Sequence, residues 1–132
     1  MARILVIDDE PAVRRMLREM LEEVGHEVVT APEGDAALAR FRQSPFDLVI
    51  TDIFMPGREG ISTIAELRRE HPDLPILALS GGGRPRPLDL ASRMDYLEVA
   101  RRHGATRVLR KPVDWEELAL TVKELLASAS TT

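Results

Sequence analysis

Four short apolar runs in this chain end at polar residues, and this pattern limits the folds that the chain can adopt. The polar residues are Asp8 with Asp9, Asp52, Ser80 and Lys111. Short buried runs that alternate with amphipathic helical segments are typical of βαβ units and a parallel sheet. The carboxyl ends of parallel strands meet at one edge of such a sheet, where ligands bind in a crevice. We therefore expect three carboxylates, a hydroxyl and an ammonium group to share one pocket.

The spacing of apolar residues predicts five strands that alternate with five helices. The helices are expected at about residues 11–24, 33–43 and 61–70, near Asp95, and from Asp114 to about residue 127. Asp9 is the expected N-cap of the first helix, whose buried face should contain Val13, Met16, Leu17, Met20, Leu21 and Val24. Asp114 and Glu117 predict a capping box, and residues 128–132 a flexible tail.

Composition and charge exclude several classes of function. A chain of 132 residues with 44% apolar residues can form one domain with its own core. The absence of cysteine excludes disulfides, thiolate metal sites and cysteine nucleophiles, and three scattered histidines give no zinc motif. A net charge of -4 argues against direct binding to nucleic acid or to an anionic membrane. Because the chain shows neither a signal peptide nor a membrane-spanning stretch, we expect a cytoplasmic protein.

The polar residues at the strand ends resemble the site of a known family. Asp8 with Asp9, Asp52 followed by Met55-Pro56-Gly57, Ser80, and Lys111 followed by Pro112 resemble, in this order, the receiver domain of two-component response regulators. The resemblance covers residues 1–127 and implies a flavodoxin-like α/β fold. That fold is a five-stranded parallel sheet in the order 2-1-3-4-5 with five helices on its two faces.

The resemblance also implies a site that accepts a phosphoryl group with the help of Mg²⁺. Phosphoryl transfer depends chiefly on positioning and electrostatic stabilisation, and clustered carboxylates supply the oxygen ligands that Mg²⁺ prefers. By resemblance, Asp52 is the phosphoacceptor and a metal ligand. Asp9 binds the metal directly, Asp8 helps through water, and the backbone carbonyl of Phe54 completes the protein ligands.

Ser80 and Lys111 would hold the phosphoryl oxygens, again by resemblance. Lys111 is one of only two lysines among 18 cationic residues, the other being Lys123. A lysine ammonium is a compact charge on a flexible stem, which suits a single phosphoryl oxygen better than a planar guanidinium does. The family often has a cis peptide bond before the proline that follows this lysine, so we expect one before Pro112.

Two features depart from the family pattern. Receivers commonly carry an aromatic residue three positions before the lysine, and this chain has Val108 there. A small, stiff valine leaves the usual switch, in which the aromatic ring turns inward, in doubt. Residues 81–94 form a longer loop than usual, which contains Arg84 and Arg86. This loop is either a regulatory segment that responds to phosphorylation or a solvated insert.

We expect a single-domain receiver that accepts a phosphoryl group from a sensor histidine kinase or a histidine phosphotransfer protein. It would then signal by contact with a downstream protein whose identity the sequence does not give, or through a homodimer. It would not be an enzyme, apart from slow loss of its own phosphoryl group. The main alternative is a degenerate receiver that acts as a constitutive interaction module. Two others are an FMN-binding electron carrier and an aspartate-nucleophile phosphatase, although Phe54 stands where such a phosphatase needs a second aspartate.

Overall fold

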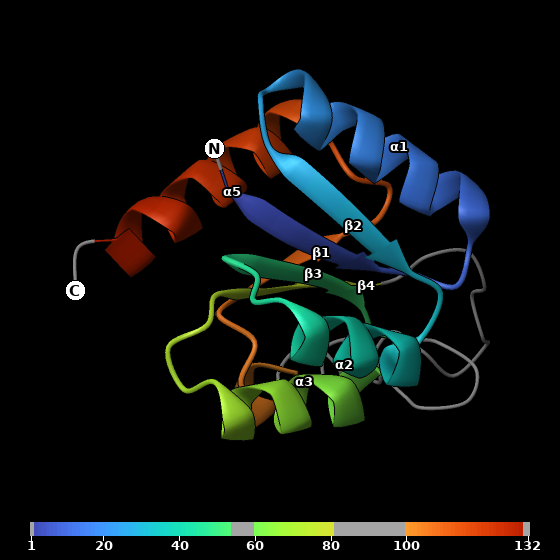
Figure 1. Cartoon of the computed structure of the whole chain (residues 1–132). Coiled ribbons are helices and arrows are strands. Elements are labelled where there is room, and N and C mark those ends of the chain that lie inside the picture. Colours follow the sequence, from blue (N-terminus) through green and yellow to red (C-terminus); the bar gives the residue numbers. More distant parts are fainter. Residues whose placement is uncertain (1, 54–59, 81–99, 131–132) are drawn as a thin grey trace, which may run out of the picture.

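The computed structural model describes residues 2–53, 60–80 and 100–130, and it shows one parallel sheet between two layers of helices (Figure 1). The strand order β2-β1-β3-β4-β5 is the predicted one. The strands are β1 (Arg3–Ile7), β2 (Glu27–Ala31), β3 (Leu48–Asp52), β4 (Ile76–Ser80) and β5 (Arg107–Arg110). All four neighbouring pairs in the sheet are parallel, so every strand ends at the same edge.

Helices α1 and α5 cover one face of the sheet, and α2 and α3 cover the other (Figure 1). These helices are α1 (Pro11–Glu23), α2 (Gly34–Gln43), α3 (Gly60–Glu70) and α5 (Trp115–Ser130). Residues 100–103 are also helical, whereas the expected helix start near Asp95 and the loop at 81–94 lie outside the described residues. None of the helices in the described ranges is both long enough and apolar enough to cross a membrane.

Most side chains of the central strands are apolar on both faces of the sheet because helices cover both. Along β1, Ile4 and Val6 belong to the core cluster that also contains residues of α1 and α5. Leu5 and Ile7 belong to the second cluster, which contains residues of α2 and α3. Successive side chains of a strand point to opposite faces, so a strand that is buried on both sides reads as a continuous apolar run. This explains why the runs are visible in the sequence.

The expected N-cap of α1 is wrong. Glu10, not Asp9, is the N-cap residue, and its side chain makes no capping hydrogen bond. Pro11 occupies the first helical position, where its missing N–H costs nothing, so the helix begins at the expected residue and the N-cap is the residue directly before it. At the other end, Gly25 has a φ of +96°, a conformation that glycine adopts at helix ends without strain.

The predicted buried face of α1 is wrong for two of its six residues. Leu17 and Leu21 are fully buried, and Val13 and Met20 are partly buried against the same cluster. Met16, however, is 37% exposed and Val24 is 48% exposed. Met16 lies at the edge of the apolar stripe, and Val24 is the C-cap residue, so it does not continue the helical face.

Helix α5 begins as predicted and extends further than predicted. The carboxylate of Asp114 accepts a hydrogen bond of 3.0 Å from the N–H of Glu117, which caps the first turn. Leu118, Val122 and Leu125 are buried against the sheet. The helix runs to Ser130, so residues 128–130, expected in a flexible tail, are helical.

Candidate functional site

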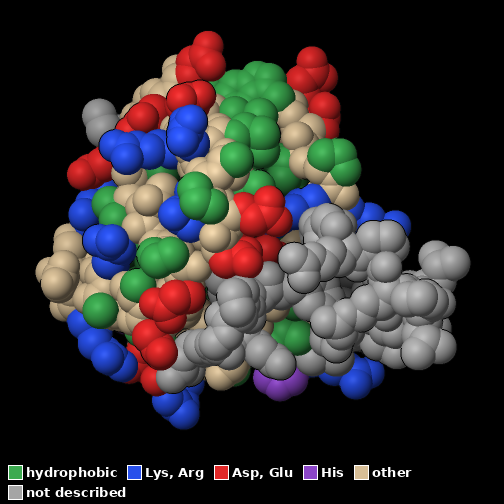
Figure 2. Space-filling model, turned by 90° about the vertical axis from the view of Figure 1, so that its right-hand side faces the viewer, with side chains coloured by type: hydrophobic (Ala, Val, Ile, Leu, Met, Phe, Trp, Pro, Cys, Tyr) green, Lys and Arg blue, Asp and Glu red, His purple; other side chains and the backbone are tan. Residues whose placement is uncertain are grey.

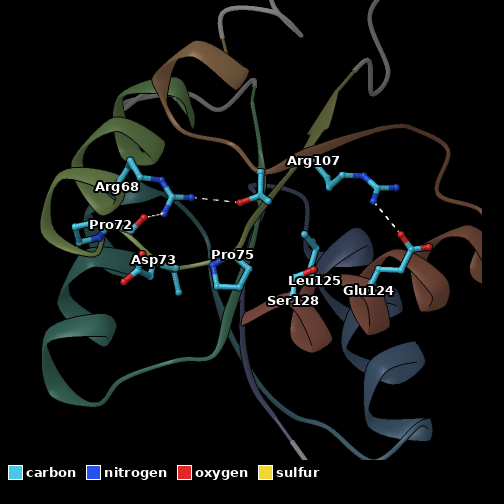
Figure 3. Close-up of a pocket in the computed structure, with 10 residues that line it drawn as sticks. Arg68, Pro72, Asp73, Pro75, Arg107, Glu124, Leu125 and Ser128 are labelled. Carbon is cyan, nitrogen blue, oxygen red and sulfur yellow. Dashed lines mark hydrogen bonds and ion pairs between the residues drawn. The ribbon is translucent and has the colours of Figure 1, made fainter. Parts of the chain in front are cut away.

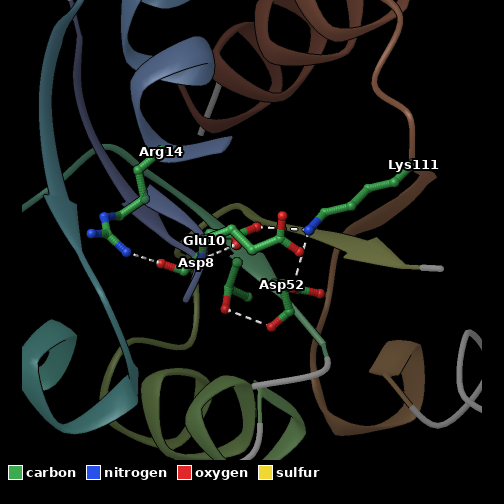
Figure 4. Close-up of polar contacts among 6 residues, drawn as sticks. Asp8, Glu10, Arg14, Asp52 and Lys111 are labelled. Carbon is green, nitrogen blue, oxygen red and sulfur yellow. Dashed lines mark hydrogen bonds and ion pairs between the residues drawn. The ribbon is translucent and has the colours of Figure 1, made fainter. Parts of the chain in front are cut away.

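Asp8, Asp52 and Lys111 meet at the edge where the strands end (Figure 4). They follow or end β1, β3 and β5, respectively. The Nζ atom of Lys111 lies 2.7 Å from Oδ2 of Asp8 and 3.1 Å from Oδ2 of Asp52, and it donates a hydrogen bond to each. The sheet therefore joins groups that are separated by 103 and 59 positions in the sequence.

This cluster is withdrawn from water. The side chains of Asp8, Asp52 and Lys111 are 0%, 6% and 8% exposed. Buried charges are tolerated when each one is paired and hydrogen-bonded. Lys111 pairs with both carboxylates, and the second oxygen of Asp8, Oδ1, accepts a 2.9 Å hydrogen bond from the N–H of Glu10. Both oxygens of Asp8 are thus engaged by the protein.

The carboxylates keep Lys111 in its charged form. Burial alone would lower the pKa of Lys111, because it penalises the ammonium. The hydrogen bond to Asp8 and the negative charges of Asp52 and Asp8 outweigh this effect, and the pKa of Lys111 is raised above its ordinary value of 10.5. Lys111 is therefore a fixed positive charge at neutral pH.

Asp9 and Glu10 add two more carboxylates beside Asp8. Carboxylate oxygens of Asp8, Asp9 and Glu10 lie within 4.8 Å of one another, and Asp9 and Glu10 are open to solvent. Figure 2 looks onto the edge where the strands end, and acidic side chains gather near its centre. A buried carboxylate with accessible carboxylates beside it is a set of hard oxygen donors that fits a divalent cation such as Mg²⁺.

Two hydrogen bonds to carbonyl oxygens hold the backbone at Asp8 and directly after Asp52. On α1, Arg14 donates a 2.7 Å hydrogen bond from Nη1 to the carbonyl oxygen of Asp8 (Figure 4). On α3, the N–H of Gly60 donates to the carbonyl oxygen of Ile53, 3.1 Å away. A Cβ atom on Gly60 would lie 2.1 Å from the carbonyl oxygen of Asp52, so only glycine permits this approach of α3 to the end of β3.

Sequence reasoning missed Glu10, Arg14 and Gly60 as parts of this site. Glu10 was detectable in principle, since it is a third acidic residue directly after the aspartate pair. Arg14 and Gly60 act through backbone contacts that depend on how α1 and α3 pack. Neither residue belongs to a motif that its sequence neighbours define.

The remaining predicted site residues are placed only in part. Ser80 is the last residue of β4, in register with Arg110 of β5, and so its backbone lies at the same edge. The peptide bond between Lys111 and Pro112 is cis, as expected. Val108 is partly buried and packs against the cluster that contains α2 and α3. Phe54, Arg84 and Arg86 lie outside the described residues.

A cavity of about 440 Å³ lies where β4 and β5 begin, at the opposite edge of the sheet from the acidic cluster (Figure 3). It is lined by Arg68, Pro72, Asp73, Leu74, Pro75, Thr106, Arg107, Glu124, Leu125 and Ser128. Arg68 donates hydrogen bonds to the carbonyl oxygens of Gly104, His71 and Pro72, at distances of 2.7 to 3.2 Å. Arg68 therefore ties the end of α3 to the turn before β5, and none of these residues belongs to the acidic cluster.

Comparison with known proteins agrees with this geometry. The family model of the response regulator receiver domain matches residues 4–123. The chain is 39% identical over 124 residues to a probable transcriptional regulator, ycf27, of Cyanophora paradoxa, with 94% of this chain and 48% of that protein covered. It is 35% identical over 130 residues to the transcriptional regulatory protein ResD of Bacillus subtilis, with 98% of this chain and 50% of that protein covered.

The chain thus spans about half the length of these curated relatives. The crystal structure of a response regulator receiver domain protein from Clostridium thermocellum superimposes with a TM-score of 0.87 at 30% identity. That match covers 99% of this chain and 98% of the other. One conclusion follows from the sheet order, from the acids and the lysine at the strand ends, and from the family match over nearly the whole length. The chain belongs to the response regulator receiver domain family.

Proposed function

We propose that the chain accepts a phosphoryl group on Asp52 from a phosphohistidine of a partner protein. The observation that carries this proposal is the placement of Lys111, whose ammonium contacts both Asp52 and Asp8 in one buried cluster. An oxygen of the Asp52 carboxylate forms the new bond to phosphorus. The bond between phosphorus and the histidine nitrogen breaks, and the imidazole keeps the electron pair and takes up a proton.

Each residue of the cluster has a separate role in the proposed transfer. Asp8, Asp9, Asp52 and the backbone carbonyl of Phe54 would hold Mg²⁺. When bound, that ion offsets the negative charge of the carboxylates and of the incoming phosphoryl group. Lys111 contributes a fixed positive charge that is already in place beside Asp52, so its ammonium does not have to be desolvated during the transfer. Ser80, at the end of β4, would donate a hydrogen bond to a phosphoryl oxygen.

The proposed partners follow from the same chemistry. A sensor histidine kinase or a histidine phosphotransfer protein supplies the phosphoryl group. Relatives such as ycf27 and ResD are named as transcriptional regulators, and this chain matches about half of each. We propose that phosphorylation changes a protein-contact surface that acts on a downstream partner or on a second copy of the chain in the cytoplasm. Slow hydrolysis of the acyl phosphate would reset the protein.

The test is direct phosphorylation of Asp52. Wild type and Asp52→Asn are incubated with MgCl₂ and acetyl phosphate, and the intact mass is measured. We expect a phosphoryl mass shift in wild type alone, and none in wild type when EDTA replaces magnesium. An unmodified wild type would instead favour a constitutive interaction module, the alternative that Val108 supports by standing where receivers commonly have an aromatic residue.

A further inference from the structure

Glu10 is the residue of the acidic cluster that the proposed phosphoryl transfer leaves unused. Its carboxylate lies within 4.8 Å of those of Asp8 and Asp9. Figure 4 shows the side chain extending from the end of β1 across Asp8 toward the side where Lys111 lies. Its backbone is held there, because its N–H donates to Oδ1 of Asp8 at 2.9 Å and Pro11 fixes the start of α1.

The four carboxylates of the site differ in how many hydrogen bonds they already accept from the described residues. Oδ1 of Asp8 accepts from the N–H of Glu10, and Oδ2 of Asp8 accepts from Lys111, which also binds Asp52. The carboxylates of Asp9 and Glu10 form no hydrogen bond or ion pair with any other described residue. Among these acids, Asp9 and Glu10 therefore have the most oxygen lone pairs left for a cation and its water.

The balance of charge also favours a cation near Glu10. The ammonium of Lys111 contacts the carboxylates of Asp8 and Asp52, and the carboxylates of Asp9 and Glu10 lie within 4.8 Å of that of Asp8. The guanidinium of Arg14 contacts the backbone of Asp8. The cluster keeps an excess of negative charge. Carboxylates held this close repel one another, and a divalent cation relieves that repulsion.

We propose that Glu10 is a further residue of the magnesium site: its carboxylate accepts hydrogen bonds from water bound to the ion and raises the affinity for Mg²⁺. Mg²⁺ usually keeps several of its waters in protein sites, so an acid beside the direct ligands can act through them. This inference rests on the proposed function, because that function places the ion among Asp8, Asp9 and Asp52. It adds a residue for which the family resemblance gave no role.

The effect of Glu10 can be separated from a general effect of charge. Glu10→Gln keeps the shape of the side chain and removes its charge. Glu19→Gln removes the same charge from an exposed position further along α1 and serves as the matched control. Since neither side chain is buried or caps the helix, both variants should fold as wild type does.

The experiment is a titration of the full chain with MgCl₂, in which isothermal titration calorimetry measures the Kd. We expect Glu10→Gln to raise the Kd for Mg²⁺ by about three- to tenfold, as loss of a charge roughly 5 Å away predicts, and Glu19→Gln to change it less than twofold. A change below twofold for Glu10→Gln, or an equal weakening by Glu19→Gln, would overturn the inference.

A second measurement separates this inference from the proposed function. At saturating Mg²⁺, the control Glu19→Gln should gain the phosphoryl mass shift from acetyl phosphate as wild type does, because it changes no residue of the site. If wild type shows no mass shift while Glu10→Gln still weakens Mg²⁺ binding, the proposed phosphoryl transfer fails and the role of Glu10 stands. If wild type is phosphorylated and Glu10→Gln binds Mg²⁺ as wild type does, the role of Glu10 alone is rejected.

Discussion

The ammonium nitrogen of Lys111 lies 2.7 Å from Oδ2 of Asp8, although the two residues are 103 positions apart in the sequence. Asp8 is fully buried, and Lys111 is the counter-ion of both Asp8 and Asp52. Removing one member of a buried ion pair costs more than the pair contributes, because the remaining charge stays buried without compensation. The stability of the fold is therefore linked to the chemistry of the site.

Replacement of Lys111 by methionine should destabilise the protein. The change keeps most of the length of the side chain and leaves two buried carboxylates without their counter-ion, which we expect to cost about 3 kcal/mol. Urea unfolding in EDTA measures the loss. Lys123→Met is the matched control, because Lys123 is the other lysine of the chain and is exposed on α5. Equal stabilities of the two variants would contradict a role for the buried pair.

The contribution of Lys111 should disappear at high pH. Because its pKa is raised in the folded state, the charged lysine stabilises the protein fully below 10.5, its ordinary pKa, and this stabilisation is lost as the pH rises through the folded-state value. We expect the difference in unfolding free energy between wild type and Lys111→Met to stay constant from pH 7 to about pH 10 and to fall above it. A difference that already vanishes at pH 8 would show that another group titrates.

Magnesium should stabilise the folded protein through the acidic cluster. A ligand that binds only the folded state at ten times its Kd adds about 1.4 kcal/mol to the free energy of unfolding. Thermal unfolding with MgCl₂ and with EDTA measures this gain. Asp9→Asn should lose most of it, whereas Glu23→Gln, an exposed change near the end of α1, should keep it.

Gly60→Ala should destabilise the contact between α3 and the end of β3. The added methyl group would lie 2.1 Å from the carbonyl oxygen of Asp52 and 2.7 Å from Cα of Ile53, so the backbone must shift. We expect a loss of about 2 kcal/mol or more in urea unfolding, as overpacking of a tight contact predicts. Arg69→Ala, at an exposed position of α3, should cost about 0.5 kcal/mol or less. Similar losses for the two variants would argue against the close approach.

Arg68→Ala should destabilise the opposite edge of the sheet. The side chain donates to the carbonyl oxygens of Gly104, His71 and Pro72, and its loss removes these hydrogen bonds, of which those to Gly104 and His71 are partly buried. We expect a cost of about 2 kcal/mol, since hydrogen bonds to charged groups contribute more than neutral ones. Arg107→Ala removes only the exposed ion pair with Glu124 and should cost about 0.5 kcal/mol. Phosphorylation of Asp52 should be unaffected in both.

The resemblance to the receiver family predicted the strand order, which the sheet shows. The meeting of Asp8 and Lys111 was predictable from the residues themselves, because it depends on two simple regularities. Strands covered on both faces read as apolar runs, and parallel strands place their last residues at one edge. Asp114 was recognisable as a cap for a similar reason, since its partner Glu117 is three positions away.

Other features depend on contacts that no local pattern describes. The exposure of Met16 depends on how α1 packs on the sheet, where only Leu17 and Leu21 are fully in the core. The need for glycine at position 60 comes from the backbone of Asp52, and Arg68 is held by the carbonyl group of Gly104, which lies 36 positions away in the sequence. Such relationships appear only after the elements have packed.

The edge position of β5 has a further consequence. Among the described strands, β5 pairs with β4 alone, yet the residue after it, Lys111, neutralises acids on β3 and at the end of β1. No fragment that lacks the last third of the chain can complete the cluster, so its two buried aspartates would face each other unshielded. The buried acids therefore gain their protein counter-ion only when the outermost strand is in place.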